Sequence, residues 1–338
     1  MMNENSFLLS ICIPTFERAS LLEQTLQSIV SDPIFRETDK VEIVISDNVS
    51  KDDTKKVCQK FTGLYPGKIK YVCLPFPRDG HINFRNALES SNGLFRKLHN
   101  DNYPFEKGAL TFLTGLVEKY REKELVLCPN HPPADREGEK ELIEEIHDLS
   151  SLVSLMSYTI TWIGAICIRK DAYEKLSDPF RYSHLYFPHI DYTLRTIYNG
   201  GKGVLTGKKL FCPAPLIPNK YTHNHAEVFA QNYLGILKEY VENSSLSRKV
   251  FEKEKRLILF EHVIPYYFDF FRQYNATPQT NYFYYTREYR KNLYYYSSFL
   301  YIAFYYMAIR IFKLNRLKNF LLSFLPKKSD LQKNEKGG

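Results

Sequence analysis

The sequence lacks the cysteine and glycine spacings that mark several common sites. None of its six cysteines forms a CxxC pair, so no zinc site is suggested. Cys12, Cys73, Cys128 and Cys167 lie in apolar runs typical of strands, which favours buried thiols in a reducing compartment. Residues 15–20, which follow the first apolar run, contain no glycine. This counts against a nucleotidyltransferase, which normally has a Gly-rich, basic loop after its first strand.

No stretch has the pattern of a signal peptide or of a clear membrane span. Residues 1–6 are polar and the next apolar run ends at Pro14, so we expect a cytoplasmic protein. Residues 293–312 are apolar but rich in Tyr, and Arg310 and Lys313 interrupt their end. This pattern predicts a packed or surface-binding helix.

The composition that is present is that of a folded chain with an excess of basic residues. Hydrophobic residues make up 44% and charged residues 25%, and 338 residues suffice for two domains. The net charge of +8 favours acidic partners such as nucleotide phosphates or anionic lipid. No recognition motif supports a nucleic-acid partner.

The first 130 residues alternate between short apolar runs and amphipathic patterns. The expected strands are residues 7–13, 41–46, 69–74, 94–98 and 125–128, and the helices between them start near 21, 52, 82 and 105. Further on we expect a surface helix or loop at 135–150, strands at 159–168 and 204–212, and helices at 171–176 and 190–198. Such alternation predicts an α/β fold with a mostly parallel sheet flanked by helices.

Polar residues directly follow the apolar runs. They are Thr15, Glu17, Asp47 and Asp101. Because ligands bind at the carboxyl ends of strands in open sheets of this kind, these four side chains predict a ligand site along one edge.

These residues belong to a series of motifs that resembles a known family. The pieces are residues 13–18 (IPTFER), residues 45–50 (ISDNVS), Arg85-Asn86, Gly93 and residues 100–102 (NDN). In this order they are similar to the inverting family-2 glycosyltransferases with a GT-A fold, of the bacterial surface-polysaccharide, abequosyltransferase-like type. The likeness covers residues 8–130 well and extends loosely to about residue 212.

The resemblance implies a nucleotide-sugar site. Pro14, Thr15, Glu17 and Asp47 are expected around the base and ribose, although Asp47 alone also suits a turn. The other expected contacts are Arg78, Arg85, Asn86, Asn100 and Asp101, with the arginines facing the diphosphate. A solvated surface role for Arg78 stays open.

The resemblance also implies a divalent metal, Mg²⁺ or Mn²⁺, on the diphosphate. Asp101 is the expected ligand and Asn102 the second one, through its amide oxygen. The family commonly has two or three acids here, whereas Asn100 and Asn102 flank a single Asp. The alternative for Asp101 is a turn residue before Pro104.

An inverting transfer needs a general base. The family takes it from a Glu-Asp pair at a helix start, and the corresponding residues 187–192 read FPHIDY. Asp191 is therefore the candidate base and His189 the second, while a plain helix-start acid is the alternative for Asp191. Trp162 is a candidate for stacking on the acceptor sugar, with core packing as its alternative. A surface loop is the favoured interpretation of His223 and His225.

The C-terminal third differs in character from the rest. We expect residues 1–225 to be the GT-A catalytic domain, with 1–130 binding the nucleotide-sugar and 131–225 on the acceptor side. Residues 226–325 are expected to form a C-terminal α-helical extension, and 326–338 a flexible tail. Basic and apolar residues alternate between Arg310 and Leu322, which predicts an amphipathic helix on an anionic membrane, or one packed on the catalytic domain or on a partner subunit.

These observations lead to one expected function and two alternatives. We expect an inverting glycosyltransferase that moves a sugar from a nucleotide-diphospho-sugar, with UDP favoured, to a saccharide or lipid-linked glycan of a bacterial capsule or O-antigen. It would work at the inner face of the cell membrane. The alternatives are a catalytically silent sugar- or membrane-binding protein with the same fold and, less favoured, a nucleotidyltransferase.

Overall fold

The computed structural model describes residues 7–129, 143–212, 224, 226–264, 286–298 and 300. Contacts divide the chain into two units. The first comprises residues 1–132 with 136–218, and the second comprises 133–135 with 219–338. The domain boundary expected after residue 225 stays a prediction.

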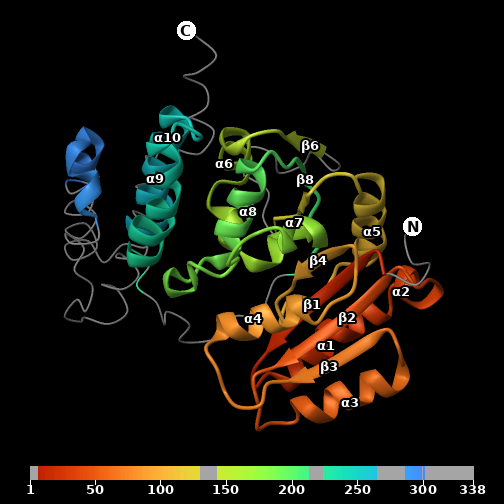
Figure 1. The fold of residues 1–338 in the computed structure, drawn as a ribbon. Coiled ribbons are helices and arrows are strands. Elements are labelled where there is room, and N and C mark those ends of the chain that lie inside the picture. Colours follow the sequence, from red (N-terminus) through yellow and green to blue (C-terminus); the bar gives the residue numbers. More distant parts are fainter. Residues whose placement is uncertain are drawn as a thin grey trace, which may run out of the picture. The chain divides into compact units, whose positions relative to one another are not determined.

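A mixed sheet forms the centre of the first unit (Figure 1). Its strands are β1 (Leu9–Thr15), β2 (Val41–Asp47), β3 (Ile69–Cys73), β4 (Phe95–Leu98), β5 (Leu125–Leu127), β6 (Ile143–Ile146), β7 (Ile166–Arg169) and β8 (Gly203–Thr206). Their order is β3-β2-β1-β4-β7-β5-β8-β6. The first four strands in this order run parallel, and β7 and β6 are antiparallel to their neighbours. The predicted α/β fold is confirmed.

Helices connect these strands and cover the sheet. They are α1 (Ala19–Val30), α2 (Pro33–Glu37), α3 (Thr54–Leu64), α4 (Gly80–Glu89), α5 (Ala109–Lys119), α6 (Leu149–Met156), α7 (Lys170–Glu174) and α8 (Pro188–Tyr198). Short 3₁₀ turns are η2 (Ser157–Thr161), η3 (Ile163–Ala165) and η4 (Ser183–Leu185). Asp32 caps α2 by accepting a hydrogen bond from Ile34 N, and Pro33 follows at the first helical position, where its missing N–H costs nothing.

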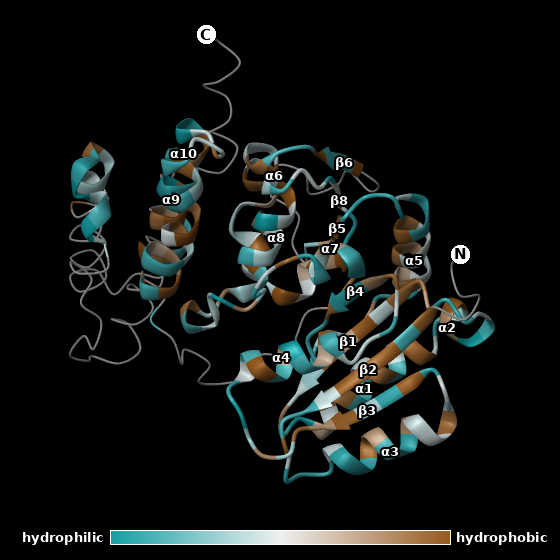
Figure 2. Cartoon of the chain, viewed as in Figure 1, coloured by the Kyte–Doolittle hydropathy of each residue, from teal (hydrophilic) through white to brown (hydrophobic). Residues whose placement is uncertain are grey.

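The two faces of β1 pack against different helices because successive side chains of a strand point to opposite sides. Leu9, Ile11 and Ile13 join a buried cluster with side chains of α1, α2, α3 and α5. On the other face α4 packs against β1 and β2. Figure 2 shows apolar residues gathered along β1 and β2, as expected for strands buried on both faces.

Three elements predicted for residues 131–225 need correction. The range 135–150, predicted as a surface helix or loop, contains β6, whose four residues pair with β8 at the sheet edge. Residues 159–165 form η2 and η3 in place of a strand, and only Ile166 onward joins the sheet. The predicted strand 204–212 ends at Thr206, after which Phe211 makes an isolated bridge to Phe105. For β6, long-range pairing, which the local pattern does not contain, decided the outcome. Residues 159–165 follow Ser157, whose positive φ of 47° ends α6.

The second unit is helical where it is described. Its elements are the π-helical η5 (Ala226–Tyr233), α9 (Leu234–Glu242), α10 (Arg248–Ile258), the π-helical η6 (Leu259–Val263) and the 3₁₀ turn η7 (Arg287–Lys291). The Tyr233 hydroxyl donates to Glu254 Oε1 at 3.0 Å, and Lys255 Nζ donates to Glu288 O at 2.8 Å, so these buried side chains are paired. The predicted basic amphipathic helix, the tail 326–338, and His223 and His225 lie outside the described residues. Within those residues, no helix combines the length and the apolar character needed to cross a bilayer.

Candidate functional site

Thr15, Asp47 and Asp101 meet at the carboxyl ends of neighbouring strands. Thr15 ends β1 and stands opposite Asp47, the last residue of β2, in the strand register. The Thr15 hydroxyl donates to Asp101 Oδ2 at 2.9 Å. All three residues are almost fully buried. The edge predicted from the sequence thus gathers two carboxylates on either side of one threonine.

Asp47 is fixed by three donors. Its Oδ1 accepts from Ser50 N at 2.9 Å and from Ser50 Oγ at 2.6 Å, and its Oδ2 accepts from the Tyr71 hydroxyl at 2.8 Å. Burial and the neighbouring Asp47 carboxylate both raise the pKa of Tyr71, so Tyr71 stays a proton donor at neutral pH. Ser50 Oγ also accepts from Glu17 N at 2.9 Å, which ties the exposed Glu17 to the same network.

Asp101 is held on its second oxygen by an arginine. Arg18 Nη1 donates to Asp101 Oδ1 at 3.0 Å, and the Thr25 hydroxyl of α1 donates to the Asp101 carbonyl at 2.9 Å. The Arg18 side chain is 37% exposed, whereas that of Asp101 is 4% exposed. A buried carboxylate therefore lies behind a partly exposed cation at this edge.

The donor atoms at residues 100–102 fit a hard cation. They are one carboxylate and two carboxamides, and Asn100 Oδ1 is buried without a hydrogen-bond partner in the described structure. Mg²⁺ and Mn²⁺ need only one or two protein oxygens when phosphate and water supply the rest. No three His, Cys, Asp or Glu side chains converge within the described ranges, so the chain offers no all-protein metal cage there.

Arg78 and Asn86 lie near the Asp47 end of the sheet. Asn48 Nδ2 donates to Arg78 O at 2.7 Å, and Arg78 N donates to Asn48 Oδ1 at 2.8 Å, which holds this loop beside β2. The Arg78 guanidinium stacks on Phe76, 3.8 Å from the ring centre, and both residues are exposed. Asn86 Nδ2 donates to Ser46 Oγ at 2.7 Å and so anchors α4 to β2.

Arg85 points to a different region. Its Nε donates to Glu89 Oε1 at 2.7 Å, and the residue lines a cavity of about 400 Å³ together with Arg96 and Tyr173. Arg96 stands opposite Ser10, near the beginning of β1. The structure therefore does not bring Arg85 to Asp101, and its predicted contact with the diphosphate finds no support in this geometry.

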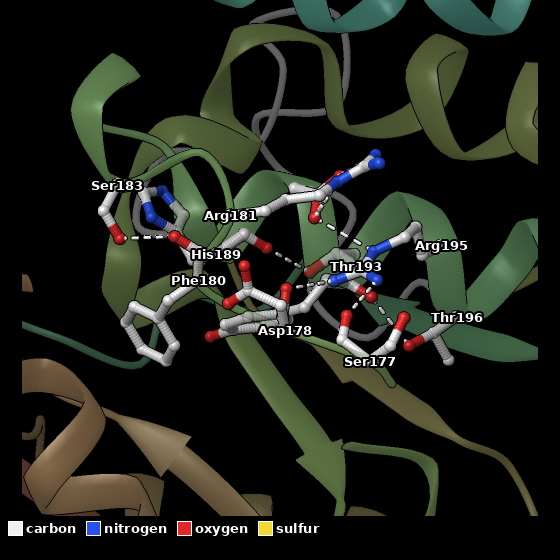
Figure 3. A network of polar contacts seen from close by, with 11 residues as sticks. Ser177, Asp178, Phe180, Arg181, Ser183, His189, Thr193, Arg195 and Thr196 are labelled. Atoms are coloured by element: carbon white, nitrogen blue, oxygen red, sulfur yellow. Dashed lines mark hydrogen bonds and ion pairs between the residues drawn. The ribbon is translucent and has the colours of Figure 1, made fainter. Parts of the chain in front are cut away.

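Asp191 is buried in a network of ion pairs. Figure 3 labels its two partners, Arg181 and Arg195. Arg181 Nη2 lies 2.6 Å and Arg195 Nε 2.9 Å from its carboxylate oxygens. Arg195 also donates to the carbonyls of Ser177 and Asp178 at 2.6 and 2.8 Å, which joins the segment before α8 to that helix. In this arrangement Asp191 acts as an anchor, and its role as the base stays a prediction.

His189 and Trp162 are also packed inside the first unit. His189 Nε2 contacts Thr161 O at 2.8 Å, and burial lowers the pKa of His189 to about 4, so the ring is neutral at pH 7. The Trp162 ring packs on Tyr103 and Phe211 with centroids 5.2 and 5.1 Å apart. This geometry favours the core interpretation of Trp162, and its stacking on a sugar stays a prediction.

Sequence reasoning missed three residues of the site. Tyr71 lies inside β3 and belongs to no motif. Ser50 and Arg18 end the ISDNVS and IPTFER segments, but the resemblance implies no contact for either. The available signal was position: Arg18 follows the end of β1 by three residues, as Asp101 follows the end of β4. Residues just beyond strand ends share one edge of a parallel sheet.

Part of the chain matches known proteins. Residues 10–95 match the model of Glycosyl transferase family 2. The GalNAc(5)-diNAcBac-PP-undecaprenol beta-1,3-glucosyltransferase of Campylobacter jejuni is 35% identical over 106 residues, which are 31% of this chain and 33% of that protein. The chain therefore aligns with about a third of this curated relative.

Solved structures share the fold beyond that segment. TarS of S. aureus matches with a TM-score of 0.55 at 15% identity, over 80% of this chain and 46% of TarS. Its fragment 1–349 in complex with UDP-GlcNAc matches with a TM-score of 0.53 at 15% identity, over 75% and 72% of the two chains. The mannosyltransferase PcManGT of Pyrobaculum calidifontis, in complex with GDP-Man and Mn²⁺, matches with a TM-score of 0.53 at 13% identity, over 75% and 70%. The family match thus covers residues 10–95, and the likeness to these solved structures shows that the chain shares their fold.

Proposed function

We propose that this chain is an inverting glycosyltransferase that uses a nucleoside-diphosphate sugar. The observation that carries the proposal is the convergence of Asp47 and Asp101 on the two sides of Thr15. One carboxylate is suited to accept hydrogen bonds from a base, and the other to anchor the diphosphate end of the same ligand. UDP is the favoured nucleotide, supported by the TarS fragment that binds UDP-GlcNAc.

The base and ribose would lie at the carboxyl ends of β1, β2 and β3. A carboxylate has about four acceptor positions, and three donors already occupy Asp47, so one position is left for an N–H of the base. Thr15 and Glu17 flank this place, and buried Pro14 precedes Thr15 in β1. The Arg78 loop, fastened by Asn48, lies at its outer side.

The diphosphate would lie at Asp101. A bound Mg²⁺ or Mn²⁺ would be held by Asp101 with the amide oxygens of Asn100 or Asn102, and it would stabilise the negative charge of the leaving diphosphate. The chain's own contribution is to fix the Asp101 carboxylate, since the Thr15 hydroxyl and the Arg18 guanidinium leave it one orientation. PcManGT, solved with Mn²⁺, is consistent with this use of the fold.

The acceptor side supplies the proton acceptor. In the displacement the acceptor oxygen bonds to the anomeric carbon, the bond from that carbon to the diphosphate oxygen breaks, and the acceptor proton passes to a carboxylate. We propose Asp191 as this base, with His189 as the second candidate. Because Asp191 is fully buried against Arg181 and Arg195, this role requires Arg181 to release it when the acceptor binds. The relative's printed name, which contains an undecaprenol-linked substrate, supports a lipid-linked glycan acceptor.

Thermal shift with nucleoside diphosphates tests the donor site. A ligand that binds only the folded state raises the melting temperature, so UDP with Mn²⁺ should raise it and adenosine should not. Asp47→Asn should abolish the UDP shift. Transfer from UDP-sugars to lipid-linked glycans is then measured for the wild type, Asp101→Ala and Asp191→Ala. No shift with any nucleoside diphosphate would refute the donor site, and a shift without turnover would favour the silent sugar-binding protein.

We further propose that the basic C-terminal segment contacts an anionic membrane. The support is its sequence, in which basic and apolar residues alternate between Arg310 and Leu322. Flotation with anionic liposomes compares the full chain with a form that lacks residues 299–338. The full chain should float and the shortened one should not, and equal behaviour would end this proposal.

A further inference from the structure

We propose that Arg18, and not Arg85, is the arginine that faces the donor diphosphate. This inference rests on the proposed function and concerns the same site. Arg18 directly precedes α1, and its Nη1 lies 3.0 Å from Asp101 Oδ1. The remaining guanidinium nitrogens have no hydrogen-bond partner among the described residues, and 37% of the side chain is exposed. One N–H group of the guanidinium therefore contacts Asp101, and the others can donate hydrogen bonds to a ligand.

Arg85 does not offer this arrangement. It lines the cavity that also contains Arg96, and Arg96 pairs with Ser10, five residues before Thr15 on β1. At 3.3 Å per residue this separates the Arg96 end of β1 from Thr15 by roughly 17 Å. Arg85 also belongs to α4, which packs on the face of β1 and β2 opposite the α1 cluster. Its Nε is engaged by Glu89 in the next helical turn.

The chemistry of the ion pair explains what Arg18 would do. A guanidinium binds phosphate oxygens through two parallel N–H groups, and it keeps its charge at any pH of interest. While one nitrogen contacts Asp101, the cation lowers the repulsion that the carboxylate would exert on an incoming diphosphate. The same contact makes Arg18 a competitor of a divalent cation for Asp101 Oδ1. Arg18 thus both attracts the diphosphate and limits cation binding to the free protein.

The test compares Arg18→Met with Arg85→Met by calorimetric titration of UDP, uridine and inorganic pyrophosphate in EDTA. Arg18→Met should weaken UDP and pyrophosphate at least about tenfold, the factor that corresponds to one charge-assisted hydrogen bond, and leave uridine unchanged. Arg85→Met should change none of the three. Arg18→Lys, which keeps the charge but loses the fork, should fall between Arg18→Met and the wild type.

A second measurement, Mn²⁺ binding by electron paramagnetic resonance without nucleotide, should show tighter binding to Arg18→Met than to the wild type. Unchanged UDP affinity in a folded Arg18→Met, or a larger loss in Arg85→Met, would overturn the inference and leave the proposed function standing. If the wild type binds pyrophosphate through Arg18 but does not bind UDP, the role of Arg18 is supported and the proposed donor is refuted. If the wild type binds neither compound, the role of Arg18 and the proposed donor are both refuted.

Discussion

Asp47 is a single buried carboxylate whose orientation is fixed while one acceptor position stays unoccupied by the described residues. Ser50 supplies two donors to Oδ1 and Tyr71 one donor to Oδ2, so the orientation is fixed without filling every acceptor position. Tyr71 belongs to β3 and Ser50 to the loop after β2, so two separate segments determine this orientation. The orientation of Asp47 is therefore a property of this edge of the sheet and not of Asp47 alone.

Tyr71→Phe should weaken both the fold and the binding of nucleotide. The lost hydroxyl leaves a buried carboxylate oxygen with one donor fewer, which costs about 1 kcal/mol of unfolding free energy. A less firmly held Asp47 should reduce UDP affinity by roughly three- to tenfold, which is the same order of energy. Urea denaturation and calorimetry measure the two effects.

Tyr65→Phe is the matched control for this change. Tyr65 packs its ring on Phe35 with centroids 5.3 Å apart, and its hydroxyl has no hydrogen bond to a described residue. This substitution should leave stability and UDP affinity within experimental error. If Tyr71→Phe behaved like Tyr65→Phe, Tyr71 would have no part in holding Asp47.

The strand-end rule predicted the carboxylates of the site but not the groups that hold them. Thr15, Asp47 and Asp101 each lie at or just beyond the end of an apolar run, so their shared edge could be read from the sequence. The orientation of Arg85 could not, because it depends on which face of α4 packs on the sheet. Tyr71 reaches Asp47 only through the pairing of β3 with β2.

At the scale of elements, Gly93 marks the closest approach between β1 and the start of β4. A Cβ built at Gly93 would lie 2.8 Å from Ser10 N and 3.1 Å from Leu9 C, which are backbone atoms that cannot move aside cheaply. Gly93 N also donates to Ser10 Oγ at 2.8 Å and to Glu42 Oε1 at 3.0 Å. Gly93→Ala should therefore destabilise the protein by about 2–3 kcal/mol in chemical denaturation.

Gly63 supplies the contrasting substitution. It lies within α3, and a Cβ there would meet no atom within 4 Å. Gly63→Ala should stabilise the protein by about 0.5–1 kcal/mol, because alanine is the better helix former. An equal effect of the two substitutions would show that crowding at Gly93 is not what β1 and β4 require.

The ion pairs of α8 allow the two roles of Asp191 to be separated. Asp191→Asn removes the charge that pairs Arg181 and Arg195, and breaking a buried pair costs about 3–5 kcal/mol of unfolding free energy. If Asp191 only anchors the helix, Asp191→Asn should show this loss of stability together with a proportionate loss of activity. If Asp191 is the base, the Asp191→Asn protein that is still folded should transfer sugar at least about a hundredfold more slowly. Arg195→Met, which disturbs the anchor but keeps the carboxylate, distinguishes the two.

The elements were predictable where strand and helix alternate and were less so where pairing is antiparallel. Each of β1 to β5 was predicted within about two residues, since each is an apolar run bounded by polar residues. By contrast β6 reads IEEI, and its two glutamates suit an edge strand as well as a loop. The η2 and η3 turns replaced a predicted strand because Ser157 adopts a positive φ of 47° and ends α6 abruptly.

At the scale of the whole molecule, unfolding has to be followed unit by unit, because chains with more than one unit need not unfold in one step. The sequence contains one tryptophan, and Trp162 belongs to the first unit. Its ring is packed beside Phe211 and Tyr103, and the neighbouring Thr161 carbonyl contacts His189. Tryptophan fluorescence therefore reports the unit that carries the candidate site.

This signal should reveal a loss of stability in mild acid that originates in buried histidines. Burial lowers the pKa of His189 to about 4 and that of His99 well below its usual range, so the unfolded chain takes up protons first. Stability from these residues is complete above about pH 6.5 and falls as the pH drops towards 4, by up to about 3 kcal/mol for His189. His189→Gln should flatten this dependence in urea titrations read by Trp162, whereas exposed His184→Gln should not. A wild-type free energy of unfolding that stays constant between pH 6.5 and 4.5 would mean that these imidazoles are solvated. The packing described around His99 and His189 would then be wrong.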